Sequence, residues 1–175
     1  MSSHWRILLF TGDGKGKTTA ALGTALRAAG HGMRVLFMQF IKNDPHTGER
    51  MAFSLLPQVE FLQVGLGFVP AETEETFAAH REAAGNALNI LQEKLKNAPY
   101  DLIVLDEICT ACYLKLIAPE DVLRQIKDAP PKVVWVLTGR GAPAALIEMA
   151  DTVTVMECRK HGLKKGFPAQ KGVEY

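Results

Sequence analysis

The chain has 175 residues, of which 47% are hydrophobic, so it is long enough for one domain with a buried core. A formal net charge of +1 gives no sign of a surface for nucleic acid or for an anionic membrane. No apolar run approaches the roughly 20 residues that a membrane-spanning helix needs, and three cysteines without a secretory signal favour a reducing cytoplasm.

Apolar runs alternate with helical patterns from one end of the chain to the other. Strands are predicted at 5–11, 33–40, 59–64, 101–106, 132–138 and 152–157, and helices at 17–30, 48–56, 72–97, 107–116, 119–128 and 143–150. The strands are almost continuously apolar, as is typical of parallel strands that are covered on both faces. The alternation predicts a three-layer α/β domain with a mainly parallel sheet of about six strands flanked by helices.

Local signals mark the ends of two of these helices. Gly30 and Gly32 are expected to end the first helix, and Pro99 to end the longest one. Thr73 and Thr76 are candidates for starting the longest helix. Its apolar side chains recur at helical spacing and predict one buried face, formed by Phe77, Ala84, Leu88, Leu91 and Leu95.

The first predicted strand leads into Thr-Gly-Asp-Gly-Lys-Gly-Lys-Thr-Thr at 11–19, which resembles a phosphate-binding loop. The usual pattern is Gly, four residues, then Gly-Lys-Ser/Thr, and here Thr11 stands at the first Gly position. Gly12, Gly14 and Gly16 allow successive N–H groups to turn toward one anion, next to the positive end of the following helix. The alternative is an ordinary Gly-rich turn, but the order of strand, loop and helix favours a nucleoside triphosphate.

The side chains of this loop add charge and a metal ligand. Lys17 supplies a mobile cation, Lys15 a second one, and the Thr18 hydroxyl suits a magnesium ion that bridges phosphate oxygens. The residues predicted to bind the nucleotide are Gly12, Asp13, Gly14, Lys15, Gly16, Lys17, Thr18 and Thr19.

A second acidic signal lies at the end of the strand predicted at 101–106. Asp106 and Glu107 follow an apolar run, as in nucleotide-binding proteins where an acid at a strand tip holds magnesium. The alternative is an ordinary helix start, where acids are favoured by the helix dipole. Glu107 is open to three roles, which are orienting water, binding metal or contacting ribose.

Two arginines are candidate nucleotide contacts. Arg140 lies between two glycines after the strand predicted at 132–138, and its planar fork matches phosphate oxygens. A solvated arginine in a surface turn is the alternative. Arg27 lies about ten residues past the loop and would reach the nucleotide only if its helix face turns that way. The loops at 11–19, 41–48, 65–71, 106–110 and 138–142 should gather beyond the carboxyl ends of the strands.

Cysteines and the end of the chain give weaker signals. Cys109 and Cys112 are interpreted as small buried thiols, because no second cysteine pair completes a zinc site. Residues 158–175 are predicted to be a C-terminal tail of the single domain 1–175. A frayed end is the alternative, but Phe167, Pro168 and Tyr175 favour a tail that packs near the active site.

These motifs together resemble the CobA/BtuR/CobO-type ATP:corrinoid adenosyltransferases from about Ile7 to Tyr175. The segments that carry the resemblance are 11–21, Gln-Phe-Ile-Lys at 39–42, Gly-Glu-Arg at 48–50, Gly67-Phe68, Val-Leu-Asp-Glu at 104–107, Thr-Gly-Arg-Gly at 138–141 and Ala-Gln-Lys-Gly-Val-Glu-Tyr at 169–175. The resemblance implies a RecA-like P-loop NTPase fold and a homodimer. It also implies transfer of the 5′-deoxyadenosyl group of ATP to Co(I) of a corrinoid, with loss of triphosphate and reduction of cobalt by a protein such as a flavodoxin.

The resemblance also assigns roles by position. Lys17, Thr18 and Glu107 are implied as catalytic, Thr18, Asp106 and Glu107 as magnesium-binding, and Arg27 and Arg140 as nucleotide contacts. ATP is implied to lie reversed in the loop, with C5′ toward the corrinoid. Phe68 matches an aromatic residue that helps to displace the lower axial ligand of cob(II)alamin, whereas a neighbouring Trp of the family falls at Pro70 here. The longer N-terminal arm of some members is not expected, because the first predicted strand begins close to Met1.

Two other functions use the same residues. A P-loop ATPase or small-molecule kinase would employ Asp106 or Glu107 to orient its nucleophile. A nucleotide or corrinoid sensor would bind without turnover.

Overall fold

Strands and helices alternate along the chain in the computed structural model, which describes residues 6–71 and 74–173. The strands are β1 (Arg6–Thr11), β2 (Val35–Gln39), β3 (Val59–Gln63), β4 (Leu102–Asp106), β5 (Val134–Thr138) and β6 (Thr152–Val155). The helices are α1 (Lys17–Gly30), α2 (Gly48–Phe53), α3 (Glu75–Asn97), α4 (Ile108–Tyr113), α5 (Pro119–Asp128) and α6 (Ala144–Met149), followed by a 3₁₀ turn at Gly162–Lys165. All six predicted strands and all six predicted helices are therefore confirmed.

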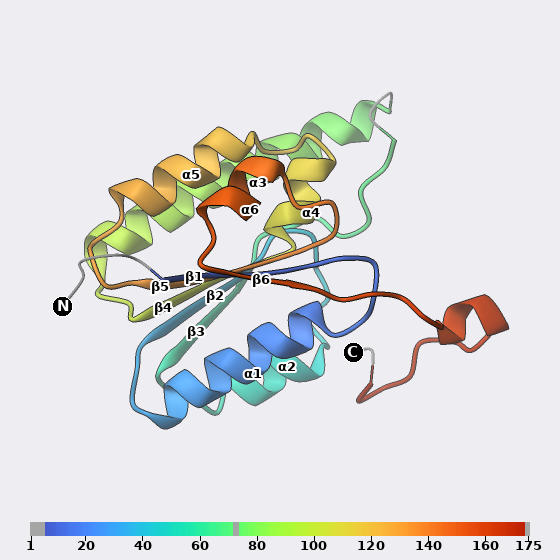
Figure 1. The fold of residues 1–175 in the computed structure, drawn as a ribbon, viewed down its shortest axis with the longest axis horizontal. Helices are drawn as coiled ribbons and strands as arrows, with labels where there is room; N and C mark the ends of the chain where they lie inside the picture. The colour runs from blue at the N-terminus through green and yellow to red at the C-terminus, as the bar shows by residue number, and fades with distance from the viewer. Residues whose placement is uncertain (1–5, 72–73, 174–175) are drawn as a thin grey trace.

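The strands form one parallel sheet in the order β3-β2-β4-β5-β1-β6. Figure 1 shows α1 and α2 on one face of this sheet and α3, α4, α5 and α6 on the other. The predicted three-layer α/β fold is confirmed. Its connections place the loops after β1, β2, β3, β4 and β5 at one edge of the sheet, where a ligand of such a fold binds.

Several elements are shorter than the sequence pattern predicts, for local reasons. The strand predicted at 33–40 begins only at Val35, because the Met33 amide bonds back to Ala28 and so closes α1. The helix predicted at 107–116 ends at Tyr113, and Lys115 then takes a left-handed conformation with φ 59°. Gly30 does end α1, and α3 ends at Asn97, two residues before Pro99. Thr76 lies in the first turn of α3, whereas Thr73 lies outside the described residues.

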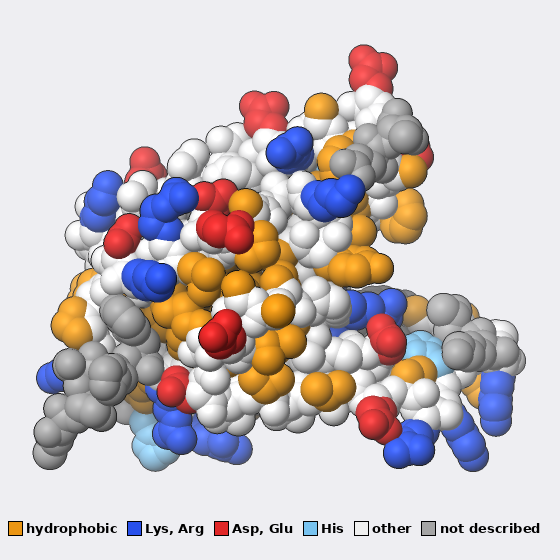
Figure 2. All heavy atoms as spheres, turned by 45° about the horizontal axis from the view of Figure 1, so that its top comes forward, with side chains coloured by type: hydrophobic (Ala, Val, Ile, Leu, Met, Phe, Trp, Pro, Cys, Tyr) orange, Lys and Arg blue, Asp and Glu red, His pale blue; other side chains and the backbone are white. Residues whose placement is uncertain are grey.

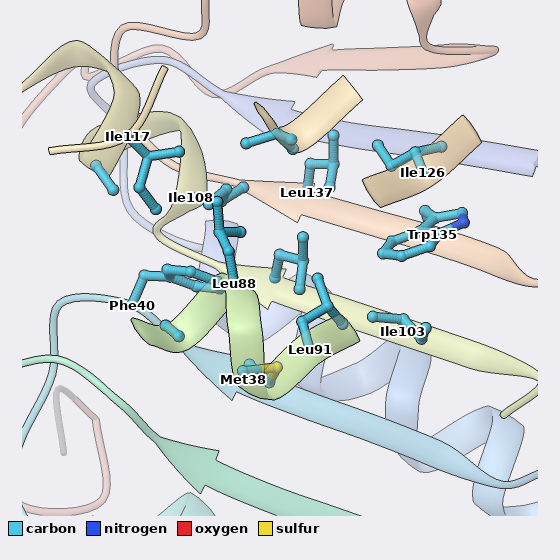
Figure 3. Close-up of a cluster of buried hydrophobic side chains, with 14 of the residues drawn as sticks. Met38, Phe40, Leu88, Leu91, Ile103, Ile108, Ile117, Ile126, Trp135 and Leu137 are labelled. Atoms are coloured by element: carbon cyan, nitrogen blue, oxygen red, sulfur yellow. The ribbon is translucent and has the colours of Figure 1, made fainter. Parts of the chain in front are cut away.

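Two apolar cores cover the two faces of the sheet. Along β2, Leu36 and Met38 face one core, and Val35 and Phe37 face the other, as the alternation of a strand requires. Figure 3 shows the larger core, in which Leu88 and Leu91 of α3 lie against strand side chains. The predicted apolar face of α3 is buried, with Leu95 packed at its border. Both faces of the sheet are therefore buried, and this packing holds the ends of the strands in place.

The edge strand β6 is the exception to this pattern. All four of its residues are exposed, although its partner β1 is largely buried. The chain after β6 continues into the 3₁₀ turn and then into the tail, which Figure 1 shows projecting beside the loop end of the sheet. No helix in the described ranges is both long and apolar enough to cross a membrane.

Candidate nucleotide site

The phosphate-binding loop joins β1 to α1 and is shaped by its glycines and by the chain after β6. Gly12 and Gly16 have φ of 95° and 110°, a region that favours glycine. Gly14 is constrained differently, because its N–H donates to the Met156 carbonyl at 2.7 Å and an added Cβ would lie 2.7 Å from that oxygen. Glycine is thus needed in the loop for two reasons. Some positions have a positive φ, and at others the backbone lies too close to Met156 to leave room for a Cβ.

Thr11 replaces the usual first glycine without opening the loop. Its side chain is buried, and its Oγ1 accepts a hydrogen bond of 3.4 Å from the Ala142 amide. The irregular position in the motif therefore ties the loop to the segment after β5.

Lys17 lies inside the loop. Its side chain is 7% exposed, and Nζ donates to the carbonyls of Gly12 at 2.6 Å and Gly14 at 2.7 Å. Burial lowers the pKa of this ammonium, against the opposing effect of nearby carboxylates such as Glu107. The cation is therefore held at the centre of the loop before a phosphate arrives.

Asp106 is the buried acid of the site, with 0% exposure. Its carboxylate accepts hydrogen bonds from Thr138 Oγ1 at 2.6 Å, Thr18 Oγ1 at 2.9 Å and Gln39 Nε2 at 3.1 Å. Burial raises the pKa of Asp106 despite these three donors. A carboxylate beside a hydroxyl of the phosphate loop is an oxygen donor set that suits Mg²⁺. Thr18 and Asp106, both predicted to bind magnesium, therefore lie within hydrogen-bond distance of each other.

Glu107 is the N-cap residue of α4 and has a left-handed conformation, with φ 63°. Its amide donates to Thr138 Oγ1 at 2.9 Å, and its carboxylate accepts a hydrogen bond from the Thr110 hydroxyl. Glu107, Lys17 and Arg140 line one cavity of about 190 Å³ together with loop residues from Gly14 to Thr19. The structure thus brings this acid and two cations to the place where phosphates would lie.

The remaining predicted residues are distributed unevenly. Asp13 lines a second cavity with Arg140, next to the same loop. Arg27 is exposed in the last turn of α1 and is not among the residues that line these two cavities. Its contact with a nucleotide stays a prediction. Phe68 is 91% exposed, on the segment between β3 and α3. Figure 2 shows the surface hollowed between this part of the chain and the C-terminal segment.

A wider apolar cavity of about 640 Å³ adjoins the phosphate loop between α1 and α2. Its wall includes Leu22 and Leu26 of α1, Phe53 of α2 and Val173 of the tail. Val173 also lines the smaller cavity of Lys17. Phe167, a predicted anchor, is 63% exposed, and Tyr175 lies outside the described residues.

Several polar residues at the site had no role assigned from the sequence. Gln39 and Thr138 contact Asp106, and Lys42 forms an ion pair of 3.0 Å with Glu49 beside them. Gln39 and Thr138 each end an otherwise apolar strand. A polar residue at such a position is the sequence signal that could have identified these two residues.

The cysteine pair is buried, as the sequence predicts. Cys109 and Cys112 carry free thiols, and burial raises the pKa of each to about 12. Among the described residues, no cluster of three or more His, Cys, Asp or Glu side chains is placed to hold a metal ion. The pair therefore contributes packing, as inert thiols.

The parallel sheet, the loop around Lys17 and the buried Asp106 define a P-loop NTPase fold of the RecA-like type. Solved structures with this fold include the KaiC-like protein PH0186 of Pyrococcus horikoshii OT3, with a TM-score of 0.58 and 17% identity over 87% of this chain and 71% of that one. Flagellar accessory protein FlaH of Methanocaldococcus jannaschii aligns with a TM-score of 0.52 and 10% identity over 86% of this chain and 70% of that one. These similarities show the fold alone.

Sequence comparison identifies the family of the chain. Residues 4–175 match the family model described as ATP:corrinoid adenosyltransferase BtuR/CobO/CobP, and the chain belongs to this family. A corrinoid adenosyltransferase of Pseudomonas aeruginosa is 40% identical over 97% of this chain and 83% of its own length. Those of Escherichia coli K12 and Salmonella typhimurium are each 38% identical over 97% of this chain and 85% of theirs.

Proposed function

We propose that this protein transfers the 5′-deoxyadenosyl group of ATP to Co(I) of a corrinoid and releases inorganic triphosphate. The corrinoid would be cobalamin, cobinamide or cobyrinic acid a,c-diamide. The observation that supports the proposal is the loop after β1, in which Lys17 Nζ bonds to the Gly12 carbonyl and the Thr18 hydroxyl bonds to Asp106. This loop lies within a chain that matches the family over residues 4–175.

The reaction forms a Co–C bond and breaks the bond between C5′ and its oxygen. Co(I) donates the electron pair and becomes Co(III), while the electrons of the broken bond leave with the triphosphate. The nucleophile belongs to the substrate, so the protein's task is to align C5′ and to stabilise the charge of the leaving group. The loop N–H groups, Lys15, Lys17 and Arg140 suit that task, because they surround the cavity beside the loop.

Magnesium fits the same site. Thr18 Oγ1 and the Asp106 carboxylate would hold it, with Glu107 near enough to the loop to line the shared cavity. A bound magnesium ion would neutralise part of the triphosphate charge. The three donors to Asp106 support this assignment, because they fix a carboxylate that is otherwise costly to bury.

We further propose that Phe68 contacts the corrinoid. Its near-complete exposure on the segment between β3 and α3 supports this, because an exposed aromatic side chain is available to a flat apolar ligand. The proposal also includes a homodimer, a cytoplasmic location and reduction of cobalt by a flavodoxin-type partner. The exposed edge strand β6 agrees with a homodimer. The buried free thiols agree with a cytoplasmic location.

One product analysis tests the proposed reaction. The protein is incubated with ATP, Mg²⁺ and a chemically reduced corrinoid, and the products are separated. Inorganic triphosphate and a light-sensitive Co–C bond are the expected products. ADP and phosphate as main products would point instead to an ATPase or kinase, and binding without turnover would point to a sensor.

A further inference from the structure

Three neighbouring strands end in polar side chains that lie in one row. Gln63 of β3 pairs with Gln39 of β2, and Gln39 pairs with Asp106 of β4, in the same parallel register. Gln39 is 0% exposed, within a strand whose every residue is buried. A buried amide at this position costs free energy unless its donors and its acceptor all find partners.

The partners of Gln39 form a chain of hydrogen bonds with one direction. Arg50 Nη1 donates to Gln63 Oε1 at 3.2 Å, Gln63 Nε2 donates to Gln39 Oε1 at 3.0 Å, and Gln39 Nε2 donates to Asp106 Oδ2 at 3.1 Å. A guanidinium can only donate and an ionised carboxylate can only accept. The two amides between them are therefore forced into a single orientation, with each NH₂ group toward Asp106.

The chain of hydrogen bonds begins on α2, the helix that lines the apolar cavity. Arg50 belongs to α2, and so does Glu49, whose Oε1 lies 3.4 Å from Gln39 Nε2 and 3.0 Å from Lys42 Nζ. Glu49 lines that cavity together with Phe53. A continuous set of polar contacts thus links α2 to the acid beside the phosphate loop.

We propose that Gln39 is a positioning residue for the magnesium carboxylate, with Gln63 and Arg50 holding its amide in place. Gln39 donates to Oδ2 of Asp106, which Thr18 Oγ1 also approaches at 3.3 Å, while Thr138 donates to Oδ1. Gln39 thereby helps to fix the rotation of the carboxylate that keeps Oδ1 2.9 Å from Thr18 Oγ1. Replacing a residue that orients a metal ligand in this way commonly lowers metal affinity by roughly 10–100-fold. This inference rests on the proposed function, because it assumes that ATP binds here with Mg²⁺.

The test measures how much Mg²⁺ strengthens ATP binding, by calorimetry with Mg²⁺ and with EDTA. Gln39→Met keeps the length and apolar stem of the side chain and removes the amide. Its Mg²⁺-dependent gain in ATP affinity should fall by roughly tenfold or more, while its affinity for ATP in EDTA stays within about twofold of wild type. A role in packing alone would not change the ratio of the two affinities.

Two further variants keep the test decisive. Gln63→Met replaces a half-buried side chain, so it is the milder change, and it should reduce the Mg²⁺-dependent gain by a smaller factor. The double variant should lose less than the product of the two single losses, because both residues act through one contact. Gln58→Met, an exposed glutamine in the turn just before β3, is the matched control and should behave like wild type.

The outcomes separate this inference from the proposed function. A wild-type gain with Mg²⁺ that Gln39→Met and Gln63→Met both retain overturns the role of Gln39 and leaves the proposed function intact. Wild-type protein that binds ATP equally well in EDTA overturns the magnesium site itself, and with it this inference. Fully multiplicative losses in the double variant would contradict the hydrogen-bonded chain.

Discussion

At the scale of single residues, two buried charges dominate the site. Lys17 is 7% exposed and Asp106 is fully buried. Burial lowers the pKa of Lys17 and raises the pKa of Asp106, so it favours the neutral form of each group. Such groups cost stability in the folded protein without ligand. Lys17 in the phosphate loop and Asp106 at the end of β4 are therefore typical of a site where stability is given up for binding.

Lys17→Ala should abolish adenosyl transfer, because the leaving triphosphate loses the cation that the loop holds between Gly12 and Gly14. We expect a loss of at least about 10²-fold in kcat, as for other single groups that stabilise developing charge. The measurement is the initial rate with chemically reduced corrinoid. Lys127→Ala, on α5 across the sheet, is the control, and near-normal activity of Lys17→Ala would refute the role.

Asp106→Asn should remove a pH dependence of stability. Because burial raises the folded-state pKa of Asp106, the folded protein holds this proton more tightly than the unfolded chain. Wild-type stability should therefore fall as the pH rises from about 3.9, the ordinary value, through the raised pKa. The variant lacks this loss, so its free energy of unfolding relative to wild type should rise by about 1.4 kcal/mol per unit of raised pKa.

The measurement for Asp106→Asn is denaturant unfolding of the protein without ligand, at several values between about pH 4 and about pH 7.5. Curves for the two proteins that run parallel over this range would contradict the account. The same variant should also lose the strengthening of ATP binding by Mg²⁺.

At the scale of elements, helices and strands could be predicted from the sequence far better than loop contacts could. The apolar run from Val35 to Met38 reports burial directly, because such a run is typical of a strand that is covered on both faces. The spacing of Leu88 and Leu91 does the same, because it follows the period of a helix. By contrast, Gln39 meets Gln63 and Asp106 only through the strand order β3-β2-β4. Strand order is a tertiary property with no local signal. The 3₁₀ turn at Gly162–Lys165 was missed for a related reason, since it is too short to show a period.

The segment between β3 and α3 carries the prediction for Phe68. Phe68→Ala should slow adenosylation that starts from cob(II)alamin and a reductant more than adenosylation from Co(I) prepared in advance. The reason is that the aromatic ring is expected to displace the lower axial ligand, a step that Co(I) no longer needs. Leu66→Ala, a partly exposed neighbour on the same segment, is the control. Equal losses in both assays would argue against ligand displacement.

The C-terminal tail carries a prediction that reports its position. Val173 lines the cavity of Lys17, so Val173→Asp would place a negative charge beside the triphosphate and should weaken ATP binding several-fold, more at low salt than at high salt. Val153→Asp, on the exposed edge strand β6, is the matched control. Since both valines are exposed, neither change should lower the free energy of unfolding by more than about 0.5 kcal/mol. Equal ATP affinities of the two variants would show that the tail does not lie over the site.

At the scale of the whole molecule, the sheet sets the geometry of the reaction. The phosphate loop, the acids at the end of β4 and Arg140 after β5 lie together at the carboxyl ends of the strands. The hollow between the Phe68 segment and the tail lies at the same end of the fold. In the proposed reaction, the protein would supply cations and a metal-binding carboxylate to ATP, and the nucleophile would come with the corrinoid. The central claim is therefore that the loop holds triphosphate as a leaving group.

The most direct test of that claim follows the oxygen between C5′ and the α-phosphorus. ATP labelled with ¹⁸O at this bridging position is turned over with Mg²⁺ and reduced corrinoid, and the products are analysed by mass spectrometry. Cleavage of the C5′–O bond predicts that the whole label leaves in inorganic triphosphate, in equal amount to the adenosylated corrinoid. Label retained in ADP, AMP or adenosine would mean that a bond to phosphorus breaks instead, and would contradict the account.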